Sequence, residues 1–503
     1  MTAPINNPVS PTLDVLFQRT LARQPHALAL IDPGNKLRVT GQLPRRLTYA
    51  EADRAISALA SHFIEAGLPA NAVVAIQLPN TIEFVLTVLA AQRVGLVVAI
   101  LPLLWRQAEL TAALNRTAAR AIVTTSKIDG VIYSDLAMNA AAEAFSIRHV
   151  CGFGSDLPEG MAPLDDIMTR DGGARRAIVH DGRKAAIISF DVTADGFRPV
   201  PRPHYSLVAA GLAISMESGF PPGATVMSAF APMSFAGLAS SLAVWLLCGG
   251  TLALHHPFDS ALLEQDLSEN SCDALVLPGP LALRLRDPEW KTRFPTVRHV
   301  AGLWRAPEQV ATSENWTVPT ASLTDVYLFG EAGLFAARRG EDGTPRAILP
   351  GSHGAPREQS GSSVRGEIMV TPKGTLGLRG PMVPIAAYAP PPPIGEMLTA
   401  EPPRDHVDTG YAARIERGSG AICITAPPSG IMAVGGYRFL SDDLQEWARR
   451  LGQGALLTAL PDRLSGHRLA GRAQDNARAR EALAELGLNP LMVEAFRDRA
   501  SAP

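Results

Sequence analysis

The stretch VVAIQLPNTIEFVLTVLAAQRVGLVVAIL, residues 73–101, predicts an apolar strand, a helix and a second apolar strand. An amphipathic helix is expected before it at 51–67, and a helix at 107–117 and a strand at 121–125 are expected after it. Apolar strands that alternate with helices are typical of parallel sheets covered on both faces. The first part of the chain is therefore expected to form an α/β subdomain.

A second series of strands and helices begins near residue 185 and predicts another α/β subdomain, stacked on the first. Its strands are expected at 185–190, 225–230, 251–256, 274–279 and 298–304. Beyond residue 340, a strand at 366–370 indicates a small β-rich unit, and the proline run at 388–396 indicates a stiff, exposed connector. We expect a large N-terminal domain at 1–428 and a short, truncated α+β C-terminal domain at 429–503.

Composition and charge narrow the class of protein. The chain has 503 residues, of which 47% are hydrophobic, so at roughly 100–200 residues per domain it holds more than one folded unit. The net charge of -2 argues against a nucleic-acid partner, which would normally meet a basic face. The four cysteines lie far apart without a CxxC pair, which argues against a zinc site or a disulfide framework and favours reduced cytosolic thiols.

One uncharged stretch, residues 235–254, is long enough to cross a bilayer. Gly249 and Gly250 interrupt it just before a β-rich segment, so a buried helix, a turn and a buried strand fit it better than a membrane span. The N-terminus has no basic segment followed by an apolar run, so no secretory signal is expected. These features predict a cytoplasmic protein without a membrane span.

Five segments resemble, in the same order, motifs of the adenylate-forming superfamily, which includes acyl-CoA synthetases, luciferases and peptide-synthetase adenylation domains. They are LTYAEADRAISALASHFIEAGL (47–68), residues 73–103 with their Leu-Pro-Asn turn, LFGEAG (328–333), DTGYAARIE (408–416) and IMAVGGYRFLSDDLQEWARRL (431–451). The resemblance implies activation of a carboxylate as an acyl-adenylate, followed by transfer to a thiol. It implies ATP or AMP and Mg²⁺ as cofactors, CoA as an acceptor, and a small-molecule carboxylic acid or acyl-CoA as partner. It leaves a protein partner and a homodimer open.

The phosphate loop of the family, TSGTTGxPKG, corresponds to residues 191–199. In such a loop, backbone N–H groups and hydroxyls bind phosphate and the lysine adds charge. Thr193 and Gly196 retain one hydroxyl and one glycine, whereas a proline stands at the lysine position. Arg198 and Arg202 are candidates to replace part of the lysine's charge.

Two aspartates, Asp191 and Asp195, enter this loop. Facing a polyphosphate they would repel it, by roughly 1 kcal/mol per charge pair at about 4 Å in water and about 4 kcal/mol at a surface-like dielectric. They could instead hold Mg²⁺, which would reverse the sign of this interaction. A tight solvated turn that has lost its ligand is the third interpretation.

Two further motifs supply candidate nucleotide contacts. The resemblance makes Glu331 a Mg²⁺ ligand and Tyr327 the aromatic residue that stacks on adenine, although a core tyrosine and an ordinary loop glutamate explain them equally well. Tyr411 stands where the family has the aspartate that binds ribose, and tyrosine cannot act as a charged bidentate acceptor. Asp408 lies nearby on the other side of the turn, and Arg414 matches an arginine of the family or forms a surface salt bridge.

The hinge and the C-terminal part also depart from the family pattern. A proline, Pro427, replaces the ribose-binding arginine, and Gly430 stands at the pivot, where glycine absorbs a large backbone rotation. The 67 residues after Gly436 contain no lysine, so the charge that a C-terminal lysine supplies to the forming adenylate is not expected. His467 is expected to be a surface histidine.

Two hypotheses for the function remain. In the first, the chain is an acid–thiol ligase of the acyl-CoA synthetase type with an altered nucleotide site, and residues 230–238 and 302–307 line the acyl pocket. In the second, it is a catalytically silent member that binds an acyl ligand, a CoA thioester or a protein. Losing one preorganised charged contact at a catalytic centre costs about 2.7–4 kcal/mol. Losses at the polyphosphate, the ribose and the transition state together favour weak or absent ATP-dependent activation.

Overall fold

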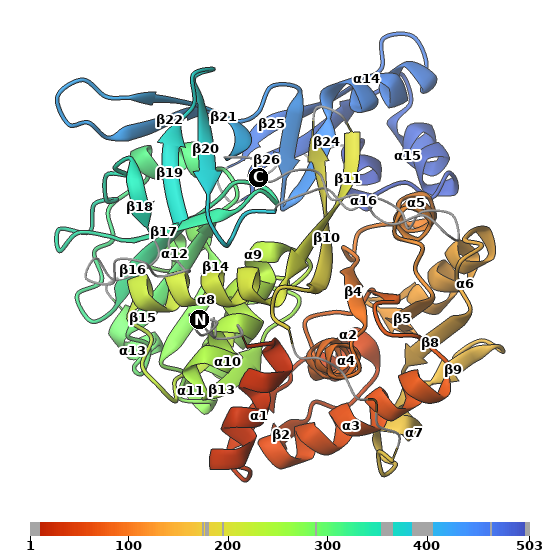
Figure 1. The fold of residues 1–503 in the computed structure, drawn as a ribbon. Coiled ribbons are helices and arrows are strands. Elements are labelled where there is room, and N and C mark those ends of the chain that lie inside the picture. The colour runs from red at the N-terminus through yellow and green to blue at the C-terminus, as the bar shows by residue number, and fades with distance from the viewer. Residues whose placement is uncertain are drawn as a thin grey trace, which may run out of the picture.

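The computed structural model describes residues 11–173, 176, 181–193, 196–286, 289–353, 366–384, 406–462 and 465–497. Within them the chain forms two large mixed sheets, a smaller sheet and a C-terminal unit (Figure 1). The expected α/β class with two stacked subdomains and a small β-rich unit is therefore confirmed. The predicted proline-rich connector at 388–396 lies outside the described residues.

The quoted stretch forms the centre of the first subdomain. It folds as β3 (Val73–Ile76), α4 (Ile82–Arg93) and β4 (Val97–Ile100), and β3 pairs with β4 in parallel. The remaining strands of this seven-stranded sheet extend the order β11-β10-β4-β3-β5-β8-β9. They are β5 (Ala121–Thr125), β8 (His149–Phe153), β9 (Met161–Pro163), β10 (Ala185–Thr193) and β11 (Gly196–Pro203).

The second subdomain is built on an eight-stranded sheet with the order β17-β16-β15-β14-β12-β13-β1-β2. Its inner strands pair in parallel, and β2 and β17 pair antiparallel at the two edges. The strands are β1 (Leu28–Ile31), β2 (Arg46–Thr48), β12 (Thr225–Ser228), β13 (Thr251–Leu254), β14 (Ala274–Pro278), β15 (His299–Trp304), β16 (Ser322–Leu328) and β17 (Leu334–Arg338).

Helices fill the space between the two sheets and cover their outer faces. The largest apolar cluster joins both sheets through the helices between them, which are α1 (Leu13–Arg23), α3 (Tyr49–Glu65), α4, α8 (His204–Ser218) and α10 (Val244–Cys248). The outer faces carry α5 (Gln107–Thr117) and α6 (Tyr133–Glu143) on the first sheet, and α11 (Ser260–Glu269), α12 (Gly279–Leu285) and α13 (Trp290–Arg293) on the second. Every residue from Ile82 to Gln92 is buried, because α4 packs between the sheets.

The uncharged stretch 235–254 is a buried helical segment, a turn and a strand, as predicted. It consists of α9 (Phe235–Leu238), a π-helical turn (Ala239–Ala243), α10 and β13, with Gly249 in the left-handed conformation at φ 65°. No helix in the described part of the chain combines the length and the apolar character that a bilayer crossing requires.

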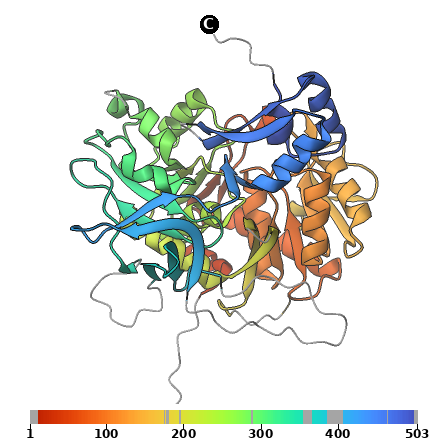
Figure 2. The same ribbon diagram turned by 90° about the horizontal axis from the view of Figure 1, so that it is seen from above.

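A five-stranded antiparallel sheet and the C-terminal unit complete the molecule. The sheet contains β18 (Gly351–His353), β19 (Gly366–Val370), β20 (Thr375–Arg379), β21 (Val407–Ile415) and β22 (Ile422–Ala426). The C-terminal unit contains β23 (Ile431–Val434), β24 (Tyr437–Leu440), α14 (Ser441–Arg450), β25 (Leu456–Asp462), β26 (Gly466–Arg472), α15 (Asn476–Glu485) and α16 (Pro490–Glu494). It has its own apolar cluster, and its strand β24 contacts β10 of the first sheet. Figure 2 shows this unit in dark blue, lying against the large domain.

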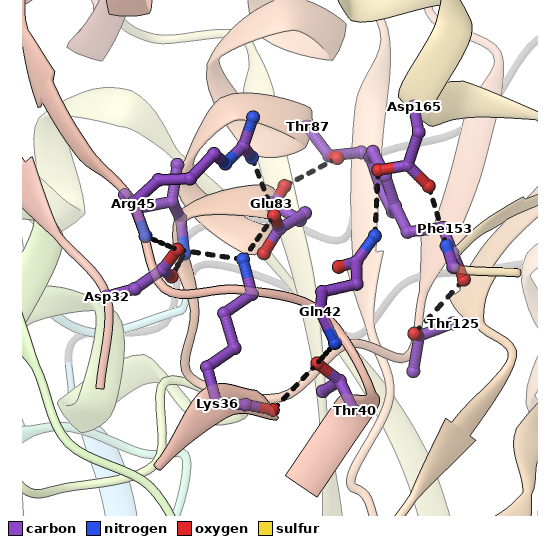
Figure 3. A network of polar contacts seen from close by, with 12 residues as sticks. Asp32, Lys36, Thr40, Gln42, Arg45, Glu83, Thr87, Thr125, Phe153 and Asp165 are labelled. Carbon is purple, nitrogen blue, oxygen red and sulfur yellow. Dashed lines mark hydrogen bonds and ion pairs between the residues drawn. The ribbon is translucent and has the colours of Figure 1, made fainter. Parts of the chain in front are cut away.

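A buried ion-pair network fixes the start of α4 (Figure 3). Lys36 Nζ lies 2.7 Å from Asp32 Oδ2 and 2.6 Å from Glu83 Oε1, and its side chain is 1% exposed. Asp32 Oδ1 accepts a hydrogen bond of 2.9 Å from the backbone N–H of Ile82, the first residue of the helix. Arg45 pairs with Glu83 at 2.6 Å. The network thus holds the segment 32–45, which includes the short helix α2 (Lys36–Thr40), against the helix that separates the two sheets.

Candidate functional site

The expected phosphate loop is a β-hairpin. Residues 196–203, which include the second half of the segment expected to be a phosphate loop, instead form β11, which pairs antiparallel with β10 in the register Asp191↔Arg198 and Thr193↔Gly196. Strand β11 lies at the edge of its sheet. Its prolines occupy the alternate positions 199, 201 and 203, so their missing N–H groups all fall on one side of the strand. An edge strand tolerates this pattern, which explains why the proline-rich segment pairs at all.

The hairpin tip carries two of the predicted phosphate contacts. Thr193 Oγ1 donates a hydrogen bond of 3.4 Å to the carbonyl of Gly196, which has φ 98°. The next helix, α8, begins at His204, so eight residues of strand separate it from the tip. Asp195 lies outside the described residues, and Arg198 lies part-way along β11.

Asp191 joins three parts of the chain at the end of the hairpin. Its Oδ2 accepts the backbone N–H of Glu331 at 3.0 Å, and its Oδ1 forms an ion pair with Arg438 Nη1 at 3.1 Å. Arg438 Nη2 also donates to the hydroxyl of Tyr411 at 3.2 Å, and Tyr411 is 1% exposed. Burial alone would lower the pKa of Arg438, but Asp191 and Tyr411 outweigh it and raise that pKa. A buried cation of the C-terminal unit is thus held by the large domain.

The carboxylate of Glu331 lies at the N-terminal end of the helical segment that starts with Phe235. Its two oxygens lie 3.1 and 3.3 Å from the backbone N–H nitrogen of Phe235. Burial, reinforced by the charge of Asp191 and opposed by that of Arg202, raises the pKa of Glu331 to about 7. The side chain predicted to bind Mg²⁺ therefore satisfies the start of a helix, a position that favours negative charge.

Arg202, a candidate replacement for the lysine of the phosphate loop, lies in the interior. It is 0% exposed, donates to the backbone carbonyls of Met382 and Glu331, and its guanidinium carbon lies 3.7 Å from the ring centroid of Phe235. Burial lowers its pKa to about 10. In this arrangement its charge holds the backbone around Glu331.

Three other predicted contacts lie apart from this cluster. Tyr327 is in the core of the second subdomain, 4% exposed, with its ring edge-on to Phe335 at 5.7 Å between centroids. Asp408 is exposed on β21 and accepts the backbone N–H of Gly410 at 2.9 Å. Arg414 is exposed and pairs with a residue of β22 across the sheet. Their roles as nucleotide contacts stay predictions.

A cavity of about 580 Å³ lies beside the cluster, between the large domain and the C-terminal unit. Of the predicted site residues, Asp191, Gly196 and Glu331 line it. One wall is aromatic, because Trp105, Phe190 and Phe197 pack with their ring centroids 5.1 to 5.3 Å apart.

The predicted acyl-pocket segments also contribute to the lining of this cavity. Ser234 and Ala236 come from the segment 230–238, and Arg305 comes from 302–307. From the C-terminal unit, Tyr437 and Trp447 also reach the cavity. The arrangement offers an apolar binding surface with a few charged groups, as is typical of small-molecule sites.

The sequence indicates neither the pairing of Arg438 with Asp191 nor the position of the Arg305 charge in the cavity. Arg438 lies 247 residues from its partner Asp191, and no spacing or periodicity connects positions so far apart. Arg305 lies in the segment 302–307, which is expected to line the acyl pocket, but the pattern of that segment does not indicate what its charge does. A basic residue directly after an apolar strand was the available signal.

Part of the chain is similar in sequence to known enzymes. Residues 17–160 match the family model of the AMP-binding enzymes. A medium-chain fatty-acid–CoA ligase of Escherichia coli (strain K12) is 25% identical over 197 residues, which are 39% of this chain and 33% of that protein. The match thus spans about a third of the length of this curated relative.

Solved structures resemble the chain over nearly its whole length. Apo MbtA of Mycobacterium smegmatis superposes with a TM-score of 0.64 and 20% identity, covering 95% of this chain and 89% of that one. A variant of the amide bond synthetase McbA of Marinactinospora thermotolerans superposes with a TM-score of 0.66 and 16% identity, covering 95% and 94%. At these identities the likeness establishes the fold.

Proposed function

We propose that this chain, whose residues 17–160 match the AMP-binding enzyme family, is an acyl- or aryl-CoA ligase-like member of the adenylate-forming superfamily in which ATP-dependent activation is weak or absent. The binding of an acyl-type ligand in the cavity between the two domains is the part of the family's activity that the structure supports best.

The observation that carries this proposal is that the charged groups at the expected phosphate site already have partners within the protein. Asp191 is paired with Arg438, and Glu331 accepts from the start of a helix. A triphosphate at the hairpin would face the negative charge of Asp191 unless Arg438 left that residue for the phosphate. Removing one partner of a buried pair costs about 3–5 kcal/mol, so such an exchange opposes tight binding.

The same residues fit a magnesium ion poorly. Both oxygens of Glu331 face the N–H of Phe235, and Asp191 accepts from the N–H groups of Val192 and Glu331 besides pairing with Arg438. Mg²⁺ requires near-octahedral oxygen ligands. Among the described residues, no group of three or more His, Cys, Asp and Glu side chains is arranged to hold a metal ion.

Transfer of the acyl group to a thiol, the second step of the family's reaction, depends less on Asp191, Glu331 and Arg438 than activation by ATP does. Transfer from a ready-made acyl-adenylate to a thiol needs a cavity that binds the acyl group and excludes water. The aromatic wall and the residues of the C-terminal unit that line the cavity support such a role. We therefore expect thioester formation from a supplied acyl-adenylate to survive better than activation by ATP.

A catalytically silent protein that binds an acyl ligand, a CoA thioester or another protein is the second candidate. The pairing of Arg438 with both Asp191 and Tyr411 favours it, because this contact ties the C-terminal unit to the large domain. The family's two half-reactions require that unit to move.

A thermal-shift titration distinguishes these functions. We expect MgATP at millimolar concentration to leave the melting temperature unchanged, whereas a non-hydrolysable acyl-adenylate analogue raises it. A ligand at 100 times its Kd stabilises the folded state by about 2.7 kcal/mol, which is readily measured. ATP–pyrophosphate exchange and thioester formation from a supplied acyl-adenylate are measured in parallel.

Each outcome of this titration favours one function. Stabilisation by the analogue together with thioester formation supports the ligase-like function. Stabilisation by the analogue or CoA without turnover supports the silent binding protein. Strong stabilisation by MgATP with full pyrophosphate exchange would overturn the proposal.

A further inference from the structure

Arg305 is a cation of the cavity for which the described residues provide no carboxylate partner. It follows β15, and its guanidinium carbon lies 4.2 Å from the ring centroid of Phe230. Stacking on a ring uses the face of the guanidinium and leaves the N–H groups at its edge available. Within the described residues Arg305 forms no ion pair with a carboxylate.

The other cations around the cavity are already engaged. Arg438 pairs with Asp191, and Arg116 donates to the carbonyl of Phe197 while lying over its ring. Arg305 therefore differs from Arg438 in having, among the described residues, no carboxylate beside its partly buried charge. Such a group is costly in a folded protein unless something else neutralises it.

The C-terminal unit closes over this arginine. Gly436, in the turn between β23 and β24, has φ 97°, and a Cβ at this position would lie 2.5 Å from Arg305 Cζ. The backbone of the turn can approach the guanidinium because no side chain intervenes. Arg305 therefore lies within the cavity at the junction of the two domains.

We propose that Arg305 binds the anionic group, a carboxylate or a phosphate, of a ligand whose apolar part packs on the wall formed by Trp105, Phe190 and Phe197. The planar fork of an arginine matches both anions in a bidentate manner. A cavity of about 580 Å³ with an aromatic wall suits an aryl or medium-length alkyl chain. This inference rests on the proposed ligand-binding function and names the class of ligand.

Isothermal titration with matched charged and neutral probes tests this role. The probes are benzoate and octanoate, their neutral isosteres benzamide and octanamide, and phenyl phosphate. We expect the wild-type chain to prefer an anion over the matching amide, and Arg305→Met to weaken anion binding by about 10- to 100-fold, as expected for hydrogen bonds to a charged group. Amide binding should be the same in both proteins.

Two further variants control for folding and for charge elsewhere. Arg305→Lys keeps the charge without the fork, so we expect it to recover part of the lost affinity. Arg417→Met removes an exposed arginine of the turn between β21 and β22, and it should leave ligand binding unchanged. Melting temperatures identify any variant that fails to fold, and Arg305→Gln replaces Arg305→Met in that case.

The outcomes show whether the bound anion is a carboxylate or a phosphate. They also test the role of Arg305 separately from the proposal that ATP-dependent activation is weak. Preference for benzoate or octanoate indicates a carboxylic acid, and preference for phenyl phosphate indicates a phosphate-bearing ligand; both support the role of Arg305. No preference of the wild type for anions, or equal anion binding by wild type and Arg305→Met, would refute it. If the protein binds MgATP strongly and Arg305→Met still weakens anion binding, the proposal of weak ATP-dependent activation is refuted and the role of Arg305 stands.

Discussion

Replacing Arg438 with methionine is expected to destabilise the protein by about 3–5 kcal/mol, the range for breaking one side of a buried ion pair. The change leaves Asp191 buried, at 8% exposed, without its counter-charge, and removes the hydrogen bond to the hydroxyl of Tyr411. Because these contacts join the C-terminal unit to the large domain, the loss should appear first as release of that unit. Hydrogen exchange at Tyr437–Leu440 and urea denaturation measure the two effects.

A surface arginine of the same unit provides the matched control. Arg449 on α14 is 73% exposed and pairs with Glu446 at 2.9 Å, so Arg449→Met should cost no more than about 1 kcal/mol. In the double variant Asp191→Asn/Arg438→Met no charge is left buried alone, and it should be more stable than Arg438→Met by itself. Equal stability of the Arg438 and Arg449 variants would show that the buried pair does not hold the unit.

The fold was predictable because its signals are local. The apolar strands and the helix of residues 73–101 were recognisable from periodicity over a few residues, and each formed as predicted. Strand β11 was missed because the prolines at 199, 201 and 203 usually indicate a loop. Its position at the sheet edge, which makes them acceptable, is set by the order of strands far apart in the sequence.

The candidate site was predictable only in part. Glu331 was identified from its motif, and the structure places it beside the cavity, but its use at the start of a helix depends on the packing of Phe235. The pairing of Asp191 with Arg438 depends on how the C-terminal unit docks, which no single segment encodes. Sequence motifs thus located the region, whereas the partner of each charge was determined by tertiary structure.

Replacing Lys36 with methionine is the second change with a large expected effect. Lys36 lies between Asp32 and Glu83, and all three side chains are at most 3% exposed. Arg45 still pairs with Glu83 in the variant, so the uncompensated charge falls mainly on Asp32. We expect a loss of about 3–5 kcal/mol in the free energy of unfolding, measured by urea denaturation at pH 8. Lys127→Met, at an exposed position on a short hairpin, is the control and should change stability by less than about 0.5 kcal/mol.

The pH dependence of this variant distinguishes lost charge compensation from lost packing. Burial and the charge of Glu83 already raise the pKa of Asp32 to about 6 although Lys36 is present, and removing Lys36 should raise it further. A carboxyl whose pKa is higher in the folded than in the unfolded state binds a proton preferentially when folded, so the stability of the variant relative to wild type improves as the pH falls. The loss caused by Lys36→Met should therefore be smaller at pH 5 than at pH 8. An equal loss at both pH values would indicate that Lys36 stabilises the start of α4 by packing rather than by its charge.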